Sequence, residues 1–306
     1  MIQLRRILCP IDFSDTSRRA LDHAVALARW YHAGVTVLHM HQVAAPVYVA
    51  PYIGPEALQP IVLTDLERAQ LVTALNECVA ADRTASGVEI ETILDESIDI
   101  PTAILSYAAS TRADLLTLGT HGRSGFQRLV LGSVTEKVLR RAGCPVLTVP
   151  PRTADAVPRE LVSIQQILCP IDFSPGSRRA LEYAVSLAQE TRARLTVLYV
   201  VELPADALEP PNSALLNYRA TCFEQARTQM KEIMRTAAPL GGSAADMVVE
   251  GRAYRQILEV AAEQHASLIV MGVQGRGAVD MWFFGSTTNH VVRQATCPVL
   301  TLRTGG

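Results

Sequence analysis

Apolar positions along the chain follow two different periods, and each period predicts a different secondary-structure element. Short runs that are almost entirely apolar, such as 6–11 and 35–40, are typical of strands buried on both faces. The segment 17–31 instead places apolar residues three and four positions apart, which predicts an amphipathic helix. Ser14 or Asp15 can cap this helix by accepting hydrogen bonds from free backbone N–H groups. Strands and helices that alternate in this way indicate a parallel sheet covered by helices on both faces.

The same two periods continue through the first 150 residues. We expect strands at 6–11, 35–40, 88–94, 114–118 and 145–149, and helices at 17–31, 63–83, 102–110 and 133–141. This order predicts an α/β domain with a doubly wound, parallel, five-stranded sheet.

The whole pattern occurs twice. The eight residues ILCPIDFS at 7–14 recur unchanged at 167–174, and both halves end on the sequence CPVLT. A repeat of this length is a complete domain, so the chain contains two fused copies of one domain. The stretch 150–158 breaks the periodicity and carries three prolines, which is typical of a linker. We therefore predict one domain over 1–150, a linker over 151–162 and a second domain over 163–306.

Composition and charge exclude several classes of protein. The 28 basic and 30 acidic residues give a net charge of −2, which argues against a nucleic-acid binder because such a protein needs a large basic face. No apolar run reaches the ~18 residues that a membrane span needs, and the N-terminus does not resemble a secretory signal. The six cysteines are sparse and form no C-x-x-C pair, which favours small buried apolar residues over a disulfide scaffold. We expect a cytoplasmic protein without nucleic-acid or membrane partners.

An aspartate ends the first strand of each half, at Asp12 and Asp172. Open α/β sheets bind ligands beyond the carboxyl ends of their strands, so both carboxylates are candidate ligand contacts. Each could accept hydrogen bonds from ribose hydroxyls or help to hold a metal ion. Each could equally do no more than accept bonds from backbone N–H groups where the next helix begins.

A glycine motif follows the fourth strand of each half. Its pattern G-x-x-G-x9-G-S covers 119–133 and recurs over 272–286. Glycines let a phosphate approach the backbone, and the helix N-terminus that follows offers unpaired N–H groups and a partial positive charge. Arg123 and Arg276 could add a full charge. The motif is neither a Walker loop nor a dinucleotide fingerprint, and we interpret it as a phosphate cradle in each half.

This glycine spacing, together with the aspartate after the first strand and the final CPVL strand, resembles the universal stress protein family in both halves. The resemblance implies an α/β fold related to nucleotide-binding hydrolases and, for this glycine pattern, the binding of ATP. Mg²⁺ belongs to the ATPase alternative given below, in which Asp12 and Asp172 hold the ion on the nucleotide. The family resemblance implies ribose and adenine contacts from the first two strands, and phosphate contacts from the glycine loop and the last helix. The first-half residues that match are Pro10, Ile11, Asp12, Met40, Leu118, Gly119, His121, Gly122, Gly132, Ser133 and Val134, and Arg123 is added as a candidate for its charge. The equivalent positions of the second half hold Pro170, Ile171, Asp172, Val200, Met271, Gly272, Gln274, Gly275, Gly285, Ser286 and Thr287, and Arg276 is added as a candidate for its charge.

The second half departs from the family pattern at two positions. Gln274 stands where the first half has His121, and Thr287 stands where it has Val134. A glutamine can donate to a phosphate but cannot carry charge. Because charge-assisted hydrogen bonds are about twice as strong as neutral ones, we expect ATP to bind the first half up to about tenfold more tightly.

The resemblance also implies that two domains pair through their last strands, here 145–149 and 298–302 within one chain; a homodimer stays open. Such pairing would cover two apolar sheet edges.

Three candidate functions are open. They are an ATP-holding stress or signalling module with slow or no turnover, a weak ATPase or phosphotransferase that uses Asp12, Asp172 and Arg123, and a nucleotide-free interaction scaffold. No catalytic residue and no dedicated metal site is assigned, since His39 and His41 lack further ligands at suitable spacing.

Overall fold

The computed structural model describes residues 2–43, 62–122, 131–151, 162–203, 213–273 and 285–303. The first half contains β1 (Arg6–Pro10), α1 (Asp15–Tyr31), β2 (Gly34–Gln42), α2 (Asp65–Ser86), β3 (Ile90–Ser97), α3 (Ile100–Ser110), β4 (Leu115–Gly119), α4 (Ser133–Arg141) and β5 (Val146–Val149). The second half contains β6 (Gln166–Ile171), α5 (Pro175–Thr191), β7 (Arg194–Val201), α6 (Ser213–Ile233), the 3₁₀ helix η3 (Met234–Ser243), β8 (Ala244–Glu250), α7 (Ala253–Glu263), β9 (Leu268–Gly272), α8 (Ser286–Gln294) and β10 (Val299–Leu302). These elements confirm the alternation that the sequence predicts, with ends that differ by a few residues.

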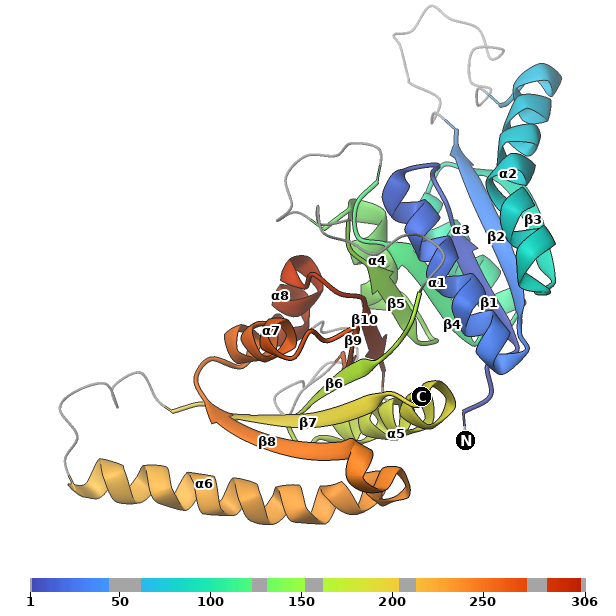
Figure 1. The fold of residues 1–306 in the computed structure, drawn as a ribbon. Helices are drawn as coiled ribbons and strands as arrows, with labels where there is room; N and C mark the ends of the chain where they lie inside the picture. Colours follow the sequence, from blue (N-terminus) through green and yellow to red (C-terminus); the bar gives the residue numbers. More distant parts are fainter. Residues whose placement is uncertain are drawn as a thin grey trace, which may run out of the picture.

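The strands form one ten-stranded sheet in the order β3-β2-β1-β4-β5-β10-β9-β6-β7-β8 (Figure 1). Within each half the strand pairs are parallel, as expected. The two halves join through β5 and β10, which pair antiparallel with Leu147 opposite Leu300. The expected pairing of the last strands is therefore present within the chain, and it merges two five-stranded sheets into one. Neither last strand is left as an exposed sheet edge.

Helices cover both faces of the sheet, and two apolar clusters lie beneath them. One cluster packs side chains such as Leu21 of α1 and Leu75 of α2 against one face. The other packs Ile104 of α3 and Leu139 of α4 against the opposite face. Because the sheet is covered on both faces, its strands have no solvent-exposed face, which explains the apolar runs in the sequence.

The first helix of each half begins in the same way. The Ser14 hydroxyl caps α1 by accepting a hydrogen bond from the Ser17 N–H, and Ser174 caps α5 through Ser177. Of the two capping candidates, Ser14 is therefore the cap. Each cap stands two residues after the aspartate that follows the preceding strand and donates to its carboxylate, so the cap geometry also fixes where that carboxylate lies.

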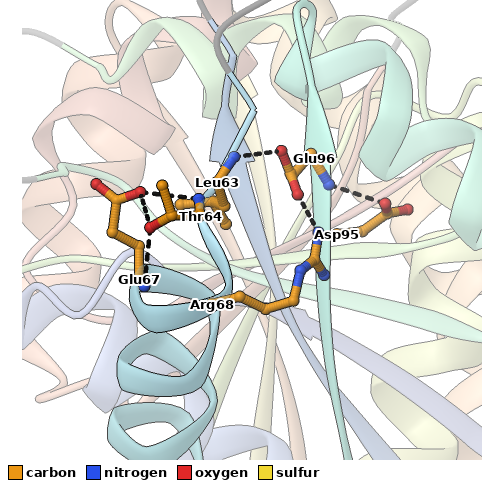
Figure 2. Close-up of polar contacts among 6 residues, drawn as sticks. All are labelled: Leu63, Thr64, Glu67, Arg68, Asp95 and Glu96. Carbon is orange, nitrogen blue, oxygen red and sulfur yellow. Dashed lines mark hydrogen bonds and ion pairs between the residues drawn. The ribbon is translucent and has the colours of Figure 1, made fainter.

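The long helix α2 is tied to the end of β3 at its first turn (Figure 2). Thr64 and Glu67 form a capping box, in which the Thr64 hydroxyl accepts from the Glu67 N–H and the Glu67 carboxylate accepts from the Thr64 N–H. The Glu96 carboxylate on β3 accepts from the Leu63 N–H at 3.1 Å and forms an ion pair with Arg68. In the second half, Arg219 and Glu250 make a corresponding ion pair between α6 and β8 at 2.6 Å.

None of the six cysteines, all of which lie in the described residues, forms a disulfide, and Cys9, Cys169 and Cys297 are buried. Burial raises the pKa of the Cys9 and Cys169 thiols far above the ordinary range. These cysteines therefore serve as small apolar residues of the core. Among the helices that the structure describes, we find none with the length and apolarity to cross a bilayer.

Candidate functional site

A cavity of about 350 Å³ opens at the carboxyl ends of β1, β2 and β4 in the first half. Strand order reverses between β1 and β4, and such a switch point is where open α/β sheets place their ligands. The volume is in the range of small-molecule sites. The lining residues are Pro10, Ile11, Asp12, Ser17, Leu38, Met40, Ile100, Ile104, Leu118, Gly119, His121, Gly122, Gly132, Ser133, Val134 and Thr135.

Eleven of the twelve first-half residues that the sequence predicts thus line this one cavity. The twelfth, Arg123, lies outside the described residues. They come from four separate segments, because the parallel arrangement brings the ends of β1, β2 and β4 and the start of α4 to one edge of the sheet.

Asp12 combines the two roles that the sequence left open. Its Oδ1 accepts hydrogen bonds from the Ser14 N–H at 3.0 Å and from the Ser14 hydroxyl at 2.6 Å. Its Oδ2 lies against the glycine loop, since a Cβ built on Gly122 would be only 2.7 Å from it. The carboxylate is therefore fixed by the start of the helix and still belongs to the cavity lining.

The turn that carries Asp12 has an unusual backbone. Phe13 has a φ of 64°, in the left-handed region that bulky residues rarely adopt. Phe173 repeats it with a φ of 63°, and the Ser174 N–H donates to Asp172 Oδ1 at the same 3.0 Å as in the first half. Two copies of one sequence thus fold to the same local geometry, which agrees with the identical octapeptides.

The glycines at the two ends of the glycine loop have different structural roles. Gly119 ends β4 against α1, where an added Cβ would be 3.0 Å from the Thr16 carbonyl carbon. The Gly132 N–H donates to the Thr120 carbonyl at 2.8 Å, which sets the loop directly before α4. The Thr135 hydroxyl donates to the Gly119 carbonyl at 2.7 Å and ties α4 back to β4. The first N–H groups of α4 therefore begin at the cavity edge, where an anion can accept from them.

His121 contributes a polar atom to the cavity. Its Nδ1 lies 2.8 Å from the Thr120 hydroxyl, while its Nε2 is buried and has no hydrogen-bond partner among the described residues. A buried ring nitrogen of this kind costs free energy unless a ligand or water bonds to it. Nε2 can therefore accept a hydrogen bond from, or donate one to, a ligand atom or a water molecule in the cavity.

The structure adds lining residues that sequence reasoning missed: Ser17, Leu38, Ile100, Ile104 and Thr135. Ile100 and Ile104 stand one helical turn apart on α3 and contribute apolar side chains to the lining together with Met40. Their i, i+4 spacing was visible in the sequence, but the same spacing marks any helix that packs on a core.

The described part of the second half repeats the same arrangement. Asp172 follows β6, Val200 lies in β7, Met271 and Gly272 end β9, and Gly285 precedes α8. The Gly285 N–H donates to the Val273 carbonyl at 3.1 Å, and the Thr288 hydroxyl donates to the Gly272 carbonyl at 3.0 Å. The remaining candidates in the described part are Pro170 and Ile171 at the end of β6 and Ser286 and Thr287 at the start of α8, whereas Gln274, Gly275 and Arg276 lie outside it.

No group of three or more His, Cys, Asp or Glu side chains that could hold a metal ion occurs among the residues that the structure describes. His39 instead lies 2.8 Å through Nδ1 from the Ile11 carbonyl. The side chain of His39 is buried.

Comparison with known proteins identifies the family. The model of the universal stress protein family matches residues 3–150 and 163–303. A universal stress protein of Mycolicibacterium smegmatis is 28% identical over 97% of this chain and 96% of its own length. One from Thermus aquaticus is 36% identical over 45% of this chain and 97% of its own length. The crystal structure of a universal stress protein from Archaeoglobus fulgidus shares the fold, with a TM-score of 0.68, 23% identity and coverage of 99% of this chain and 100% of that one. The chain belongs to the universal stress protein family, with one domain of that family in each half.

Proposed function

We propose that this protein is a stress-response or signalling module that binds ATP and hydrolyses it slowly or not at all. The observation that carries the proposal is the first-half cavity, because it combines an apolar slot, a fixed carboxylate, a glycine-lined helix N-terminus and a buried ring nitrogen with no described partner. Few ligands other than a nucleotide need all four features at once.

Each part of the nucleotide has a chemically matched part of the cavity. The adenine packs between Met40 and Ile104, where the lining is apolar. The Asp12 carboxylate accepts from the ribose hydroxyls. The phosphates lie against Gly132 and the first N–H groups of α4, where the helix dipole favours negative charge. His121 Nε2 completes this end by donating to a phosphate oxygen.

The lining also supports slow turnover. Asp12 is the one carboxylate among the described lining residues, and it already accepts two hydrogen bonds from Ser14. A general base for water needs a free acceptor close to the γ-phosphate, and the described lining offers no second carboxylate for that role. Mg²⁺ would arrive with the triphosphate and neutralise part of its charge.

We propose a second, weaker ATP site in the second half. Asp172 and the start of α8 repeat the first-half geometry, and the substitution of Gln274 for His121 replaces a donor that can carry charge with a neutral amide. The expected difference in affinity is up to about tenfold.

The test uses the full chain. The purified protein is denatured and its supernatant is separated by ion exchange, and nucleotide-free protein is titrated with ATP by calorimetry. Asp12→Ala should weaken ATP binding at the tighter site by at least tenfold, because a charge-assisted contact is lost. Asp15→Ala is the matched control, since it removes an exposed carboxylate from the same turn.

Released ATP or measurable ATP binding supports the proposal. Released ADP with steady turnover would favour the ATPase alternative instead. No nucleotide and no binding heat would overturn nucleotide binding and leave the interaction scaffold.

A further inference from the structure

His39 lies directly behind the first-half site. Successive residues of a strand point to opposite faces, so Leu38 and Met40 line the cavity while His39 of β2 faces the other side of the sheet. Its side chain is only 6% exposed. Its Nδ1 lies 2.8 Å from the Ile11 carbonyl oxygen. A carbonyl can only accept, so Nδ1 carries the proton and donates it.

His39 also contacts the residue on the other side of Asp12. Its ring lies 4.6 Å from the Phe13 ring, with an angle of 44° between the two planes. His39 therefore holds the backbone before Asp12 through a hydrogen bond and the side chain after it through a ring contact. Phe13 adopts a left-handed conformation that a bulky residue avoids, and these two contacts from His39 stabilise the turn from outside.

The second half shows what changes when this histidine is replaced. Tyr199 takes the equivalent place, and its ring lies 4.6 Å from Phe173, so the ring contact is kept. A tyrosine, however, carries its hydroxyl at the far end of the ring and has a carbon where histidine has Nδ1. The hydrogen bonds from Ser174 to Asp172 repeat those from Ser14 to Asp12. In the second half, Arg178 Nε also donates to the Phe173 carbonyl at 3.4 Å. The side-chain donor to the backbone before the aspartate is therefore one difference between the supports of Asp12 and Asp172.

We propose that His39 is a positioning residue for the first site: by donating to the Ile11 carbonyl it fixes the Asp12 carboxylate toward the ribose hydroxyls of a bound nucleotide. The second half, with Tyr199, lacks this donor and discriminates less on the ribose. The proposal rests on the proposed nucleotide binding and adds a residue that does not touch the nucleotide.

The experiment compares ATP with 2′,3′-dideoxy-ATP, which lacks the hydroxyls that Asp12 would bind. Titrations of the full chain with Asp172→Ala in the second half give the preference of the first site for ATP over the dideoxy nucleotide. His39→Phe keeps a ring beside Phe13 but removes the donor. The loss of one hydrogen bond behind the carboxylate should lower this preference about fivefold, with the affinity for dideoxy-ATP unchanged.

His39→Asn is the conservative variant, because its amide nitrogen occupies nearly the position of Nδ1 and can still donate. It should restore most of the preference that His39→Phe loses, although it has no ring. The reciprocal change, Tyr199→His with Asp12→Ala, should raise the preference of the second site for ATP. This gain is measured in a separate protein, so it tests the proposal even where His39→Phe does not fold.

Equal weakening of both nucleotides by a folded His39→Phe would mean that His39 only stabilises the domain, and it would overturn the positioning role while the proposed function stands. An unchanged preference in Tyr199→His would likewise overturn it. A wild-type chain that binds neither nucleotide would overturn the proposed function and this role together.

Discussion

The atoms around a single glycine determine its structural role, as three glycines between the end of β4 and the end of α4 show. Gly119 faces the backbone of α1 at 3.0 Å, so its lack of a Cβ serves the packing of strand against helix. Gly122 faces the Asp12 carboxylate, so its lack of a Cβ leaves room for that group in the cavity. Gly143, at the other end of α4, has nothing within 4 Å of an added Cβ. Gly119 therefore serves packing, Gly122 leaves room for the Asp12 carboxylate, and Gly143 has no steric constraint.

This separation makes Gly122→Ala a sharp test of the site. The new Cβ would be 2.7 Å from Asp12 Oδ2, so the carboxylate must move, and it is the flexible end of a side chain that moves rather than backbone. We expect a fold that remains intact and ATP affinity at the first site that falls at least tenfold. Calorimetric titration and a thermal melt of the same protein check both parts.

Gly143→Ala is the matched control, and it should leave both the affinity and the melting temperature unchanged within error. If Gly122→Ala bound ATP as tightly as the wild type, the Asp12 carboxylate would have no part in binding.

At the scale of elements, each outer helix is tied to its edge strand by an arginine–glutamate ion pair. Arg68 of α2 pairs with Glu96, and Arg219 of α6 pairs with Glu250. Exposed ion pairs contribute little to stability, so the capping box at Thr64 is the stronger feature of α2 (Figure 2). Hydrogen bonds from Thr64 lower the pKa of Glu67, which keeps this carboxylate charged at the positive end of the helix.

Thr64→Ala should loosen the first turn of α2 without unfolding the domain. Loss of a threonine cap costs about 1 kcal/mol, which is about a fivefold increase in local opening. Hydrogen exchange followed by mass spectrometry should show faster exchange for the amides of the first turn, with the rest of α2 unchanged. Thr64→Ser keeps the capping oxygen and should exchange like the wild type, and equal rates for Thr64→Ala would show that the cap does not hold this turn.

At the scale of the whole molecule, the two halves share a core as well as a sheet. One apolar cluster continues from Leu27 of α1 to Leu187 of α5, and a cavity of about 20 Å³ remains at this junction. His23 of α1 and Tyr183 of α5 line the cavity from opposite sides. Burial, and secondarily the charge of Arg19, lowers the pKa of His23 from 6.5 to about 4.

This histidine makes the stability of the protein depend on pH. The unfolded chain binds a proton at His23 below pH 6.5, whereas the folded chain stays neutral there until about pH 4. Above pH 6.5, His23 does not reduce the free energy of unfolding. As the pH decreases from 6.5 to 4, this group lowers the free energy of unfolding by about 3 kcal/mol in total.

Urea unfolding of the wild type and of His23→Gln at several pH values measures this contribution. Glutamine does not titrate, so the difference in unfolding free energy between the two proteins should change between pH 7 and pH 4 in favour of the variant. A constant difference over that range would show that folding does not lower the pKa of His23.

Much of the fold could be predicted from the sequence because its signals are local. The apolar runs around 6–11 and 35–40 became β1 and β2, and the octapeptide at 7–14 built the same turn in both halves. The doubly wound order followed from the alternation of strands and helices, the pairing of the last strands followed from the family resemblance, and both are present. The unequal affinity of the two sites stays a prediction.

The sequence by itself determined the number of domains, the type of each element and the segments that carry the candidate chemistry, because backbone period and motif spacing depend on neighbouring residues. Only the tertiary structure decided which residues share a space. Ile100 and Ile104 reach the cavity because α3 packs beside α4, and His39 supports Asp12 because β2 pairs with β1. Such contacts join residues that are far apart in the chain. Which of them meet depends on how whole helices and strands pack, and a local sequence pattern does not specify that packing.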